Sequence, residues 1–519
     1  MEKKEKYGVG QQDFRVLRTR DCVYVDKTKY IEKIVHSGSQ YYFLARPRRF
    51  GKSLFLSTLQ YFFEGRRELF KGLYIDGTDW DWKSYPVLRL DLNMERYAEP
   101  GKLDDVLDNV FRGWEAKYGV ICKDTNPPQR FRSIIEAVHD KTGMPVVILV
   151  DEYDKPLVSN LNREENYEHY REKLASLYSN FKSSAEHIRL VFLTGVSRFS
   201  KLSVFSDLNN LRDITFEDDY ADICGITERE LQDNFKAGVA ALADKEHRSY
   251  EDILRILKEN FDGYRFSRYG SEIYNPWSLL NSLDTSEIAF YWNRTGMPTI
   301  VVESLQNIDA DLEEVLNTQC TINTLLGLDL KSANPLALLY QTGYLTIKDY
   351  DRDEQIFTLG VPNREVKEGL FDTLLPFYVK VKQGFVETVV FNITKNIRQG
   401  NPEKLMSSLQ TYFAGIPYGL KMDNENNFQN AFYILMSLIG IKVSAEVSTS
   451  NGRIDILLET PKYIYIIELK YDGTAEDALR QIEERLYARP YQNKQRKIFK
   501  IGVSFSSKTR CIEDWKIAD

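Results

Sequence analysis

The chain of 519 residues is too long for one hydrophobic core, and typical domain sizes predict about three to four compact units. Its net charge of −7 excludes a uniformly basic nucleic-acid coat protein and leaves only a local basic surface for such contacts. No stretch approaches the roughly 18 apolar residues that cross a membrane, and the N-terminus lacks the apolar core of a signal peptide. The five cysteines are scattered, without a CxxC pair or a nearby histidine at zinc spacing, so we expect a cytoplasmic protein without disulfides or a zinc site.

Alternating strand-like and helix-like segments occupy residues 1–225, the first predicted domain. Four short apolar runs are typical of strands, at residues 41–45, 86–92, 145–150 and 189–194. The third run, PVVILV, carries β-branched residues on both faces, as does a strand buried inside a parallel sheet. Because helical patterns separate the runs, the sequence predicts βαβ units and a parallel sheet with right-handed crossovers.

A phosphate-binding loop is predicted after the first strand, where the sequence reads RPRRFGKS. Gly51 lets the backbone approach phosphate oxygens, and the following helix presents free N–H groups and its positive dipole end. Lys52 is expected to reach the β- and γ-phosphates of ATP, and Ser53 to ligate Mg²⁺. The residues expected to bind the nucleotide here are Arg49, Phe50, Gly51, Lys52, Ser53 and Leu54. The first glycine of GxxxxGK[ST] is replaced by Arg46, so a basic turn that happens to contain Gly-Lys-Ser is the alternative.

A second element of an ATP site is predicted where the strand PVVILV ends in Asp151 and Glu152. Asp151 is expected to hold Mg²⁺ and Glu152 to polarise the attacking water. The next strand ends at Thr194, with Arg198 close behind. In AAA-type ATPases such residues sense the γ-phosphate, so Thr194 is a candidate sensor and Arg198 a candidate finger or sensor. A solvated loop or helix cap is the alternative for each residue alone, but the order of the two elements favours the ATP site.

The middle region, residues 226–375, has a mainly helical pattern with frequent turns. Near its end, residues 337–363 predict a small β-hairpin, as in a winged-helix-like lid. Two short helices, at residues 367–383 and 402–413, lead into the last predicted domain. That domain spans residues 376–519, with its core at 420–519, and the order of its elements is helix, three strands, helix, strand. The Asn-Gly turn at 451–452 is a strong hairpin signal between the first two strands.

A metal site is predicted on two neighbouring strands of the last domain. Glu468 and Lys470 share one face of their strand because residues alternate faces, and a hairpin brings Asp455 alongside. Two carboxylates and the carbonyl of Leu469 make a hard oxygen site suited to Mg²⁺ or Mn²⁺. A lysine beside such an ion can orient or deprotonate water, as phosphodiester hydrolysis requires. A salt bridge on the surface of a hairpin is the alternative.

Further residues around this predicted site are candidates for supporting roles. Glu425 and Glu446 could each supply another metal ligand, and Gln481 could hold the attacking water or a phosphate. Tyr487 follows on the same helix pattern, about two turns later. The stretch at residues 489–500 holds five basic residues and no acids. Such a run predicts either a groove for DNA or RNA or a solvated loop.

Ten short motifs together resemble one family over nearly the whole chain: the bacterial AAA-ATPase-like proteins whose C-terminus is a PD-(D/E)XK nuclease-superfamily domain. The motifs are YVDKT, RPRRFGKS, LVDEYDKPL, LTGVSRFS, FDGYRF, YNPWS, YQTGYLTI, GVPNREV, GRIDI and IIELK. Arg46 in the phosphate-binding loop matches this family's own pattern. The resemblance implies ATP binding through Lys52, Ser53 and Asp151, and a nuclease-like site at three further residues, Asp455, Glu468 and Lys470.

The leading interpretation is an ATP-regulated or ATP-driven nuclease that acts on DNA or RNA. A second is a nucleotide-controlled switch or nucleic-acid-binding protein whose nuclease fold is catalytically silent. A third is an interaction scaffold that binds ATP and hardly hydrolyses it. An oligomer stays open as well, because AAA-type rings need an arginine from a neighbouring subunit.

Overall fold

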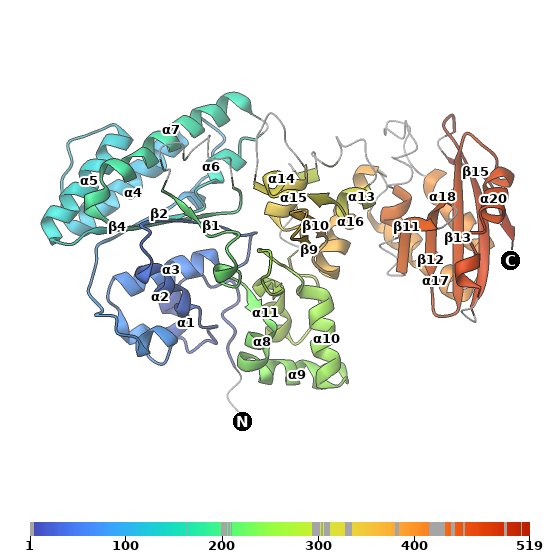
Figure 1. The fold of residues 1–519 in the computed structure, drawn as a ribbon, viewed down its shortest axis with the longest axis horizontal. Helices are drawn as coiled ribbons and strands as arrows, with labels where there is room; N and C mark the ends of the chain where they lie inside the picture. Colours follow the sequence, from blue (N-terminus) through green and yellow to red (C-terminus); the bar gives the residue numbers. More distant parts are fainter. Residues whose placement is uncertain are drawn as a thin grey trace. The chain divides into compact units, whose positions relative to one another are not determined.

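The structure is a computed structural model of the chain. It describes residues 5–161, 163–198, 210–292, 301–302, 312–326, 335–378, 383–414, 431–436, 442–449, 452–492, 496–509 and 511–518, together with Phe205, Leu208 and Leu305. Two compact units form, Met1–Gly296 with Thr318–Val366 and Met297–Asn317 with Lys367–Asp519 (Figure 1). The predicted domain boundaries at residues 225 and 375 stay predictions. None of the described helices has the length and apolar composition that crossing a bilayer would require.

A five-stranded parallel sheet forms the centre of the first unit, in the order β2-β3-β4-β1-β5. The strands are β1 (Tyr41–Ala45), β2 (Val87–Asp91), β3 (Val146–Asp151), β4 (Ile188–Gly195) and β5 (Arg212–Asp213). This sheet confirms the predicted α/β fold, and four of its strands fall within a residue or two of the predicted runs. The two-residue β5 was not predicted, because so short a strand carries no periodic pattern.

Helices cover both faces of this sheet (Figure 1). One layer holds α1 (Phe14–Thr19), α2 (Thr28–His36) and α3 (Lys52–Phe63), and the other α4 (Lys102–Tyr118), α5 (Pro127–Thr142) and α7 (Glu164–Ser183). Every residue of β3 is buried as a consequence. That burial explains why the sequence of this strand is apolar on both faces.

A helical region follows the sheet in the first unit, as predicted. It contains α8 (Glu228–Asn234), α9 (Lys236–Glu246), α10 (Tyr250–Phe261) and α11 (Pro276–Thr285). Their apolar faces share one core, which includes Leu231, Val239, Leu257 and Leu279. A capping box between Thr227 and Glu230 begins α8, so its first N–H groups are satisfied locally.

The predicted hairpin is confirmed as β9 (Thr346–Asp351) and β10 (Ile356–Gly360), which pair antiparallel. A third strand, β8 (Gln319–Cys320), pairs with β10 and completes a small sheet. This sheet belongs to the first unit together with α14 (Ile322–Leu326) and α15 (Pro335–Thr342).

The second unit is built on a mixed sheet in the order β11-β12-β13-β14-β15. Its strands are β11 (Lys442–Thr449), β12 (Gly452–Glu459), β13 (Tyr463–Tyr471), β14 (Lys497–Ser506) and β15 (Cys511–Ala518). Among the described strand pairs of this sheet, only β13 and β14 are parallel, and α20 (Ala475–Glu484) makes the crossover between them and packs on both. This arrangement confirms the predicted order of three strands, a helix and a strand, with β15 as an additional edge strand.

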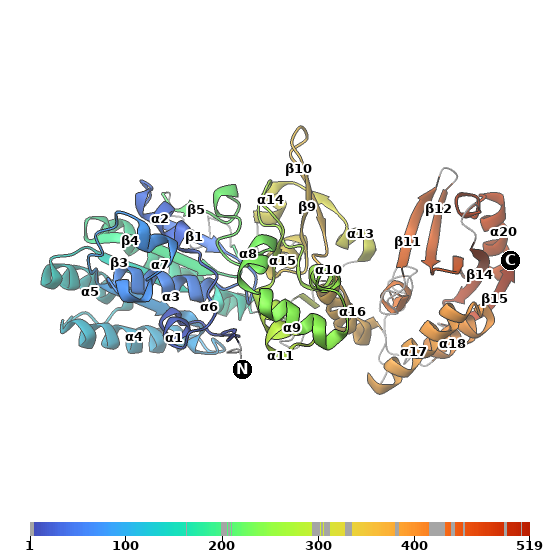
Figure 2. The same ribbon diagram turned by 90° about the horizontal axis from the view of Figure 1, so that it is seen from below.

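Consecutive helices lead from the end of the first unit toward this sheet. They are α16 (Arg364–Tyr378), α17 (Gln383–Gln399) and α18 (Pro402–Ala414). The sequence predicted α16 and α18 and missed α17. Figure 2 shows α17 beside α18, and α18 packs against β15.

The guanidinium of Arg46 anchors the start of the phosphate-binding loop inside the first unit. Its side chain is 1% exposed and donates hydrogen bonds to the carbonyl oxygens of Ala45 and Thr215, both at 2.9 Å, and of Tyr220 at 3.0 Å. It also lies over the ring of Phe266, 4.5 Å from the centroid. One planar cation thus joins the end of β1 to two other segments of the unit.

Arg46→Lys is expected to lower the free energy of unfolding by about 2–4 kcal/mol, because a single ammonium cannot reach three carbonyls and stack on a ring at once. Urea unfolding followed by circular dichroism measures the loss. Arg48→Lys, at the exposed neighbouring position, is the control, with an expected change within about 0.5 kcal/mol. Equal stability of the two variants would contradict the anchoring role.

Candidate functional site

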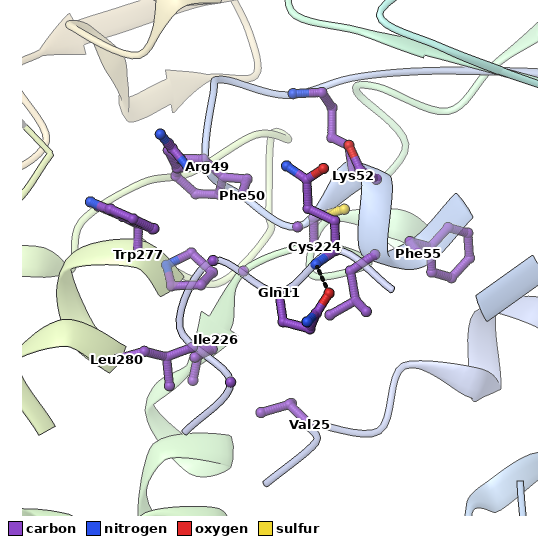
Figure 3. Close-up of a pocket in the computed structure, with 18 of the residues that line it drawn as sticks. Gln11, Val25, Arg49, Phe50, Lys52, Phe55, Cys224, Ile226, Trp277 and Leu280 are labelled. Carbon is purple, nitrogen blue, oxygen red and sulfur yellow. Dashed lines mark hydrogen bonds between the residues drawn. The ribbon is translucent and has the colours of Figure 1, made fainter. Parts of the chain in front are cut away.

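A pocket of about 380 Å³ lies at the N-terminus of α3 (Figure 3). The phosphate-binding loop forms its polar side, where Lys52 and Ser53 lie. Figure 3 shows Val25, Ile226 and Leu280 on the side away from Lys52. The pocket therefore has the size and the division into polar and apolar parts that a nucleotide requires.

The phosphate-binding loop is closed by its own lysine. Gly51, at the N-cap of α3, has a φ of 96°, which only glycine adopts without strain. The ammonium of Lys52 donates to the carbonyl oxygens of Arg46 and Pro47, at 3.0 and 3.1 Å. Because an ammonium has three N–H groups, one is left for a phosphate oxygen. The six predicted residues Arg49, Phe50, Gly51, Lys52, Ser53 and Leu54 all line the pocket.

Asp151, at the carboxyl end of β3, is hydrogen-bonded to Ser53, as a shared metal site requires, although Asp151 itself is not among the residues that line the pocket. The Asp151 side chain is 2% exposed, and burial raises the pKa of this carboxyl, whereas a hydrogen bond from Ser53 lowers it. Its Oδ1 has no hydrogen-bond partner among the described residues, and the nearest ion-pair partner is Arg89, at 3.6 Å from Oδ2. A buried carboxylate oxygen without a partner beside a hydroxyl fits Mg²⁺.

Glu152 follows Asp151 and lines the pocket. Its backbone has a φ of 53°, in the left-handed region that non-glycine residues rarely adopt. Such a conformation persists at a position where surrounding contacts hold it. The predicted water-polarising residue thus lies in a strained turn at the rim of the pocket.

The two predicted sensors lie outside the lining of this pocket. The hydroxyl of Thr194 donates to the carbonyl oxygen of Leu44 in β1, at 2.9 Å. The guanidinium of Arg198 pairs with Asp213, and its backbone N–H donates to the side-chain oxygen of Gln341 at 2.7 Å. Both residues therefore make structural contacts, and their roles as sensors stay predictions.

In the second unit, the structure brings Asp455, Glu468 and Lys470 together. The antiparallel register of β12 and β13 sets Asp455 opposite Glu468, so both carboxylates share one face of the sheet. The Oδ2 of Asp455 accepts the backbone N–H of Leu469 at 2.7 Å. The ammonium of Lys470 lies 3.5 Å from the Oε1 of Glu468.

Gln481 connects the lysine to the buried carboxylate. Its side-chain NH₂ donates to the Oε1 of Glu468 and lies 3.4 Å from the hydroxyl of Tyr487, while its oxygen accepts from Lys470 at 2.7 Å. Glu468 is 1% exposed; burial and then the charge of Asp455 raise its pKa to about 7. These bonds let Gln481 orient two neighbours, and its predicted contact with water or a phosphate stays a prediction.

The donor set of this second site fits a divalent cation. The Oε2 of Glu468 is buried without a hydrogen-bond partner in the described part of the chain, beside the carboxylate of Asp455. Oxygen donors of this kind suit Mg²⁺ or Mn²⁺. No group of three or more His, Cys, Asp or Glu arranged for a metal occurs among the described residues. Glu425 lies outside the described residues, as does the side chain of Glu446, so neither predicted ligand can be placed.

The predicted basic stretch at residues 489–500 is partly neutralised within the second unit. Arg496 pairs with Glu459 at 2.7 Å, and Lys500 with Glu483 at 2.6 Å. Paired cations attract a phosphate backbone less than free ones. The stretch therefore offers fewer charges to a nucleic acid than its sequence indicates.

Several residues of the first site were not identified from the sequence. Asn93, Lys155, Cys224 and Trp277 line the pocket, and Trp277 lies under the guanidinium of Arg49, 4.2 Å away. Lys155 and Trp277 belong to the motifs LVDEYDKPL and YNPWS, to which the sequence analysis assigned no further role. Membership of such a motif was the only signal that could have found Lys155 and Trp277.

The parallel sheet with its phosphate-binding loop and the mixed sheet with its acid pair define the class: an AAA-ATPase-like protein with a PD-(D/E)XK nuclease domain. Residues 8–205 match the family model described as "Predicted AAA-ATPase", and residues 423–515 match that of the "PD-(D/E)XK nuclease superfamily". An Azotobacter chroococcum mcd 1 protein, described as "Uncharacterized protein in vnfD 5'region", is 34% identical over 523 residues and covers 98% of both chains. The chain therefore belongs to the family of AAA-ATPase-like proteins with this C-terminal domain, and the resemblance is confirmed.

Binding of Mn²⁺ at Asp455 and Glu468 is expected to release about one proton at pH 6 and almost none at pH 8, because the Glu468 carboxyl with its pKa of about 7 must ionise to bind the ion. Affinity should accordingly rise with pH up to about 7 and then level off. Calorimetric titrations in buffers of different ionisation enthalpy measure the released protons. Glu468→Gln is the control and should abolish the release; proton release unchanged in this variant would contradict the assignment.

Proposed function

We propose that this protein binds and hydrolyses ATP and that its nucleotide state controls a metal-dependent nuclease acting on DNA or RNA. One observation carries the proposal. Each site combines a lysine with a buried carboxylate oxygen that has no hydrogen-bond partner among the described residues, on Asp151 in one and Glu468 in the other. Leaving such an oxygen unpaired costs about 1–3 kcal/mol, which a bound cation would recover.

At the first site, the chain's own residues divide the work of phosphoryl transfer. Backbone N–H groups at the start of α3 and the remaining N–H of Lys52 bind phosphate oxygens. Ser53 and Asp151 would hold Mg²⁺, which neutralises charge on the phosphates when bound. Glu152 accepts a hydrogen bond from the attacking water and draws off its proton. The apolar side of the pocket binds the base.

At the second site, Asp455 and Glu468 would hold Mg²⁺ or Mn²⁺ with the carbonyl of Leu469. A divalent ion in this position lowers the pKa of a bound water and stabilises the charged transition state. Lys470 holds the attacking water in line with the phosphate, and Gln481 keeps the ammonium in place. Glu425 and Glu446 stay candidates for a further ligand.

One observation favours a second function, a nucleotide-controlled switch or nucleic-acid-binding protein with a silent nuclease fold. The ammonium of Lys470, which would orient the attacking water, is already held by the side-chain oxygen of Gln481 at 2.7 Å and lies 3.5 Å from Glu468. Under either function we place the protein in the cytoplasm, with ATP and a nucleic acid as partners, and an oligomer stays open.

Glu152→Gln is expected to reduce the kcat of ATP hydrolysis by about 100–1,000-fold while the Kd for ATP stays within about threefold, because the amide cannot take a proton from water. Phosphate release and the fluorescence of a labelled ATP analogue measure the two quantities. Lys52→Ala should lose ATP binding. Glu165→Gln, an exposed acid on α7, is the matched control. Undiminished hydrolysis by Glu152→Gln would overturn the proposed ATPase.

Asp455→Ala and Lys470→Ala are each expected to reduce cleavage of labelled nucleic acid by at least about 100-fold in Mg²⁺ or Mn²⁺, because they remove a metal ligand and the water-orienting cation. Single- and double-stranded DNA and RNA are compared with and without ATP. Lys462→Ala, exposed on the same hairpin, is the control. Cleavage unchanged in both variants would reject this site, and binding without cleavage in every metal would support the silent fold.

A further inference from the structure

Asp154 lies in the same turn as Glu152 but faces away from the pocket. Its neighbours Glu152 and Lys155 line the pocket, whereas Asp154 is 1% exposed and is not part of the lining. Its carboxylate accepts the backbone N–H groups of Val196 and Ser197, at 3.1 and 2.6 Å. These two residues directly follow β4, so Asp154 ties the turn after β3 to the segment after the neighbouring strand.

Helix capping does not account for this aspartate. Asp154 is the N-cap of the short helix α6 (Lys155–Val158), yet its side chain makes no capping hydrogen bond. A carboxylate at an N-cap ordinarily accepts from the first turn of its own helix. Here it reaches across to another strand end instead. Its contacts are therefore tertiary contacts.

The same two segments are joined by further hydrogen bonds on each side of this carboxylate. The backbone N–H of Tyr153 donates to the carbonyl oxygen of Thr194 at 3.1 Å, and its hydroxyl to that of Ser197 at 2.9 Å. A Cβ at Gly195 would lie 2.4 Å from an oxygen of Asp154, so only glycine allows this approach. The turn and the segment after β4 thus form one hydrogen-bonded unit, with Asp154 in its interior.

The contact of Asp154 with Val196 and Ser197 supports the strained backbone of Glu152. A non-glycine residue in the left-handed region costs about 1 kcal/mol or more, so an unsupported turn would relax. Burial, and then the charge of Glu152, raise the pKa of Asp154 to about 6, so its carboxylate is ionised at neutral pH and accepts both N–H groups. An ionised acceptor makes stronger hydrogen bonds than a neutral one.

We propose that Asp154 is a positioning residue for ATP hydrolysis: it clamps the turn that presents Glu152 to the segment following β4, and so directs the Glu152 carboxylate at the γ-phosphate end of the pocket. This inference rests on the proposed ATPase. Asp154 acts through Glu152 and does not touch the nucleotide. Loss of the clamp should therefore affect the hydrolytic step and spare ATP binding.

Asp154→Asn tests the clamp, because the amide replaces the ionised acceptor of both N–H groups with a weaker neutral one and places a donor where the other oxygen now lies 3.3 Å from the N–H of Val196. We expect kcat for ATP hydrolysis to fall about 10–100-fold, as for a misplacement of about 1 Å, while the Kd for ATP changes less than about threefold. Glu365→Gln is the matched control. Glu365 is also a buried carboxylate that accepts a backbone N–H, from Trp292 at 2.7 Å, and it lies outside the pocket lining. Its substitution should leave kcat unchanged.

A double-mutant cycle separates positioning from general stability. In single-turnover assays, adding Asp154→Asn to Glu152→Gln should cost less than about twofold further, because the residue through which Asp154 acts is already disabled. Tyr153→Phe removes one outer bond of the clamp and is a milder variant should Asp154→Asn fail to fold. We expect it to lower kcat about two- to fivefold, again without a change in ATP binding.

Three results would overturn this inference while leaving the proposed ATPase standing. They are an unchanged kcat in Asp154→Asn, a loss of ATP affinity as large as the loss of kcat, or a double variant whose rate falls by the product of the two single losses. If Asp154→Asn does not fold, an unchanged kcat in Tyr153→Phe overturns it instead. Absence of ATP hydrolysis by the unsubstituted chain would overturn the proposed function, and this inference with it. The two failures are thus distinguished by the rate of the unsubstituted protein.

Discussion

The pocket at the start of α3 depends on one buried cation, the guanidinium of Arg46. A planar group with five fixed donors can bind several carbonyl oxygens at once, and here it takes those of Ala45, Thr215 and Tyr220. Phe266, against which it stacks, also contacts Phe50 of the phosphate-binding loop, with ring centroids 5.2 Å apart. Contacts within the protein alone therefore fasten the helical region to the loop. A glycine at this position would make the turn and lose the connection.

Much of the fold follows from local patterns in the sequence, and the exceptions have physical causes. The strands β1 to β4 and β12 to β14 are apolar runs bounded by polar residues, which identifies them directly. The edge strand β15 carries charged residues, as exposed edges do, and so lacks an apolar pattern. The helix α17 was missed because its sequence is rich in valine, isoleucine and threonine, whose branched side chains favour strands.

The residues of the candidate sites also fall into those that a sequence pattern identifies and those that only the folded chain brings into place. Lys52, Asp455 and Glu468 could be identified because a loop motif and the two-residue period of a strand place their side chains. Asp154 and Trp277 could not, because their roles arise from segments that meet only in the folded chain. Hydrogen bonds between distant segments leave no periodic trace in a sequence. A motif whose chemistry is not assigned shows that several neighbouring residues matter, but it does not show which of them has which role.

The strand order of the central sheet sets the distance between the two strand ends that carry the first site. Since β4 lies between β1 and β3, two strand spacings of about 4.8 Å separate the end of β1, where the phosphate-binding loop begins, from the end of β3 by about 10 Å, and Ser53 at the start of α3 spans this distance to reach Asp151. The hydroxyl of Thr194 bonds to Leu44 across one of those spacings and holds the strands in register. Backbone pairing therefore fixes the distance between the ends of β1 and β3. Side-chain substitutions near these ends change the chemistry of the site and leave this distance as it is.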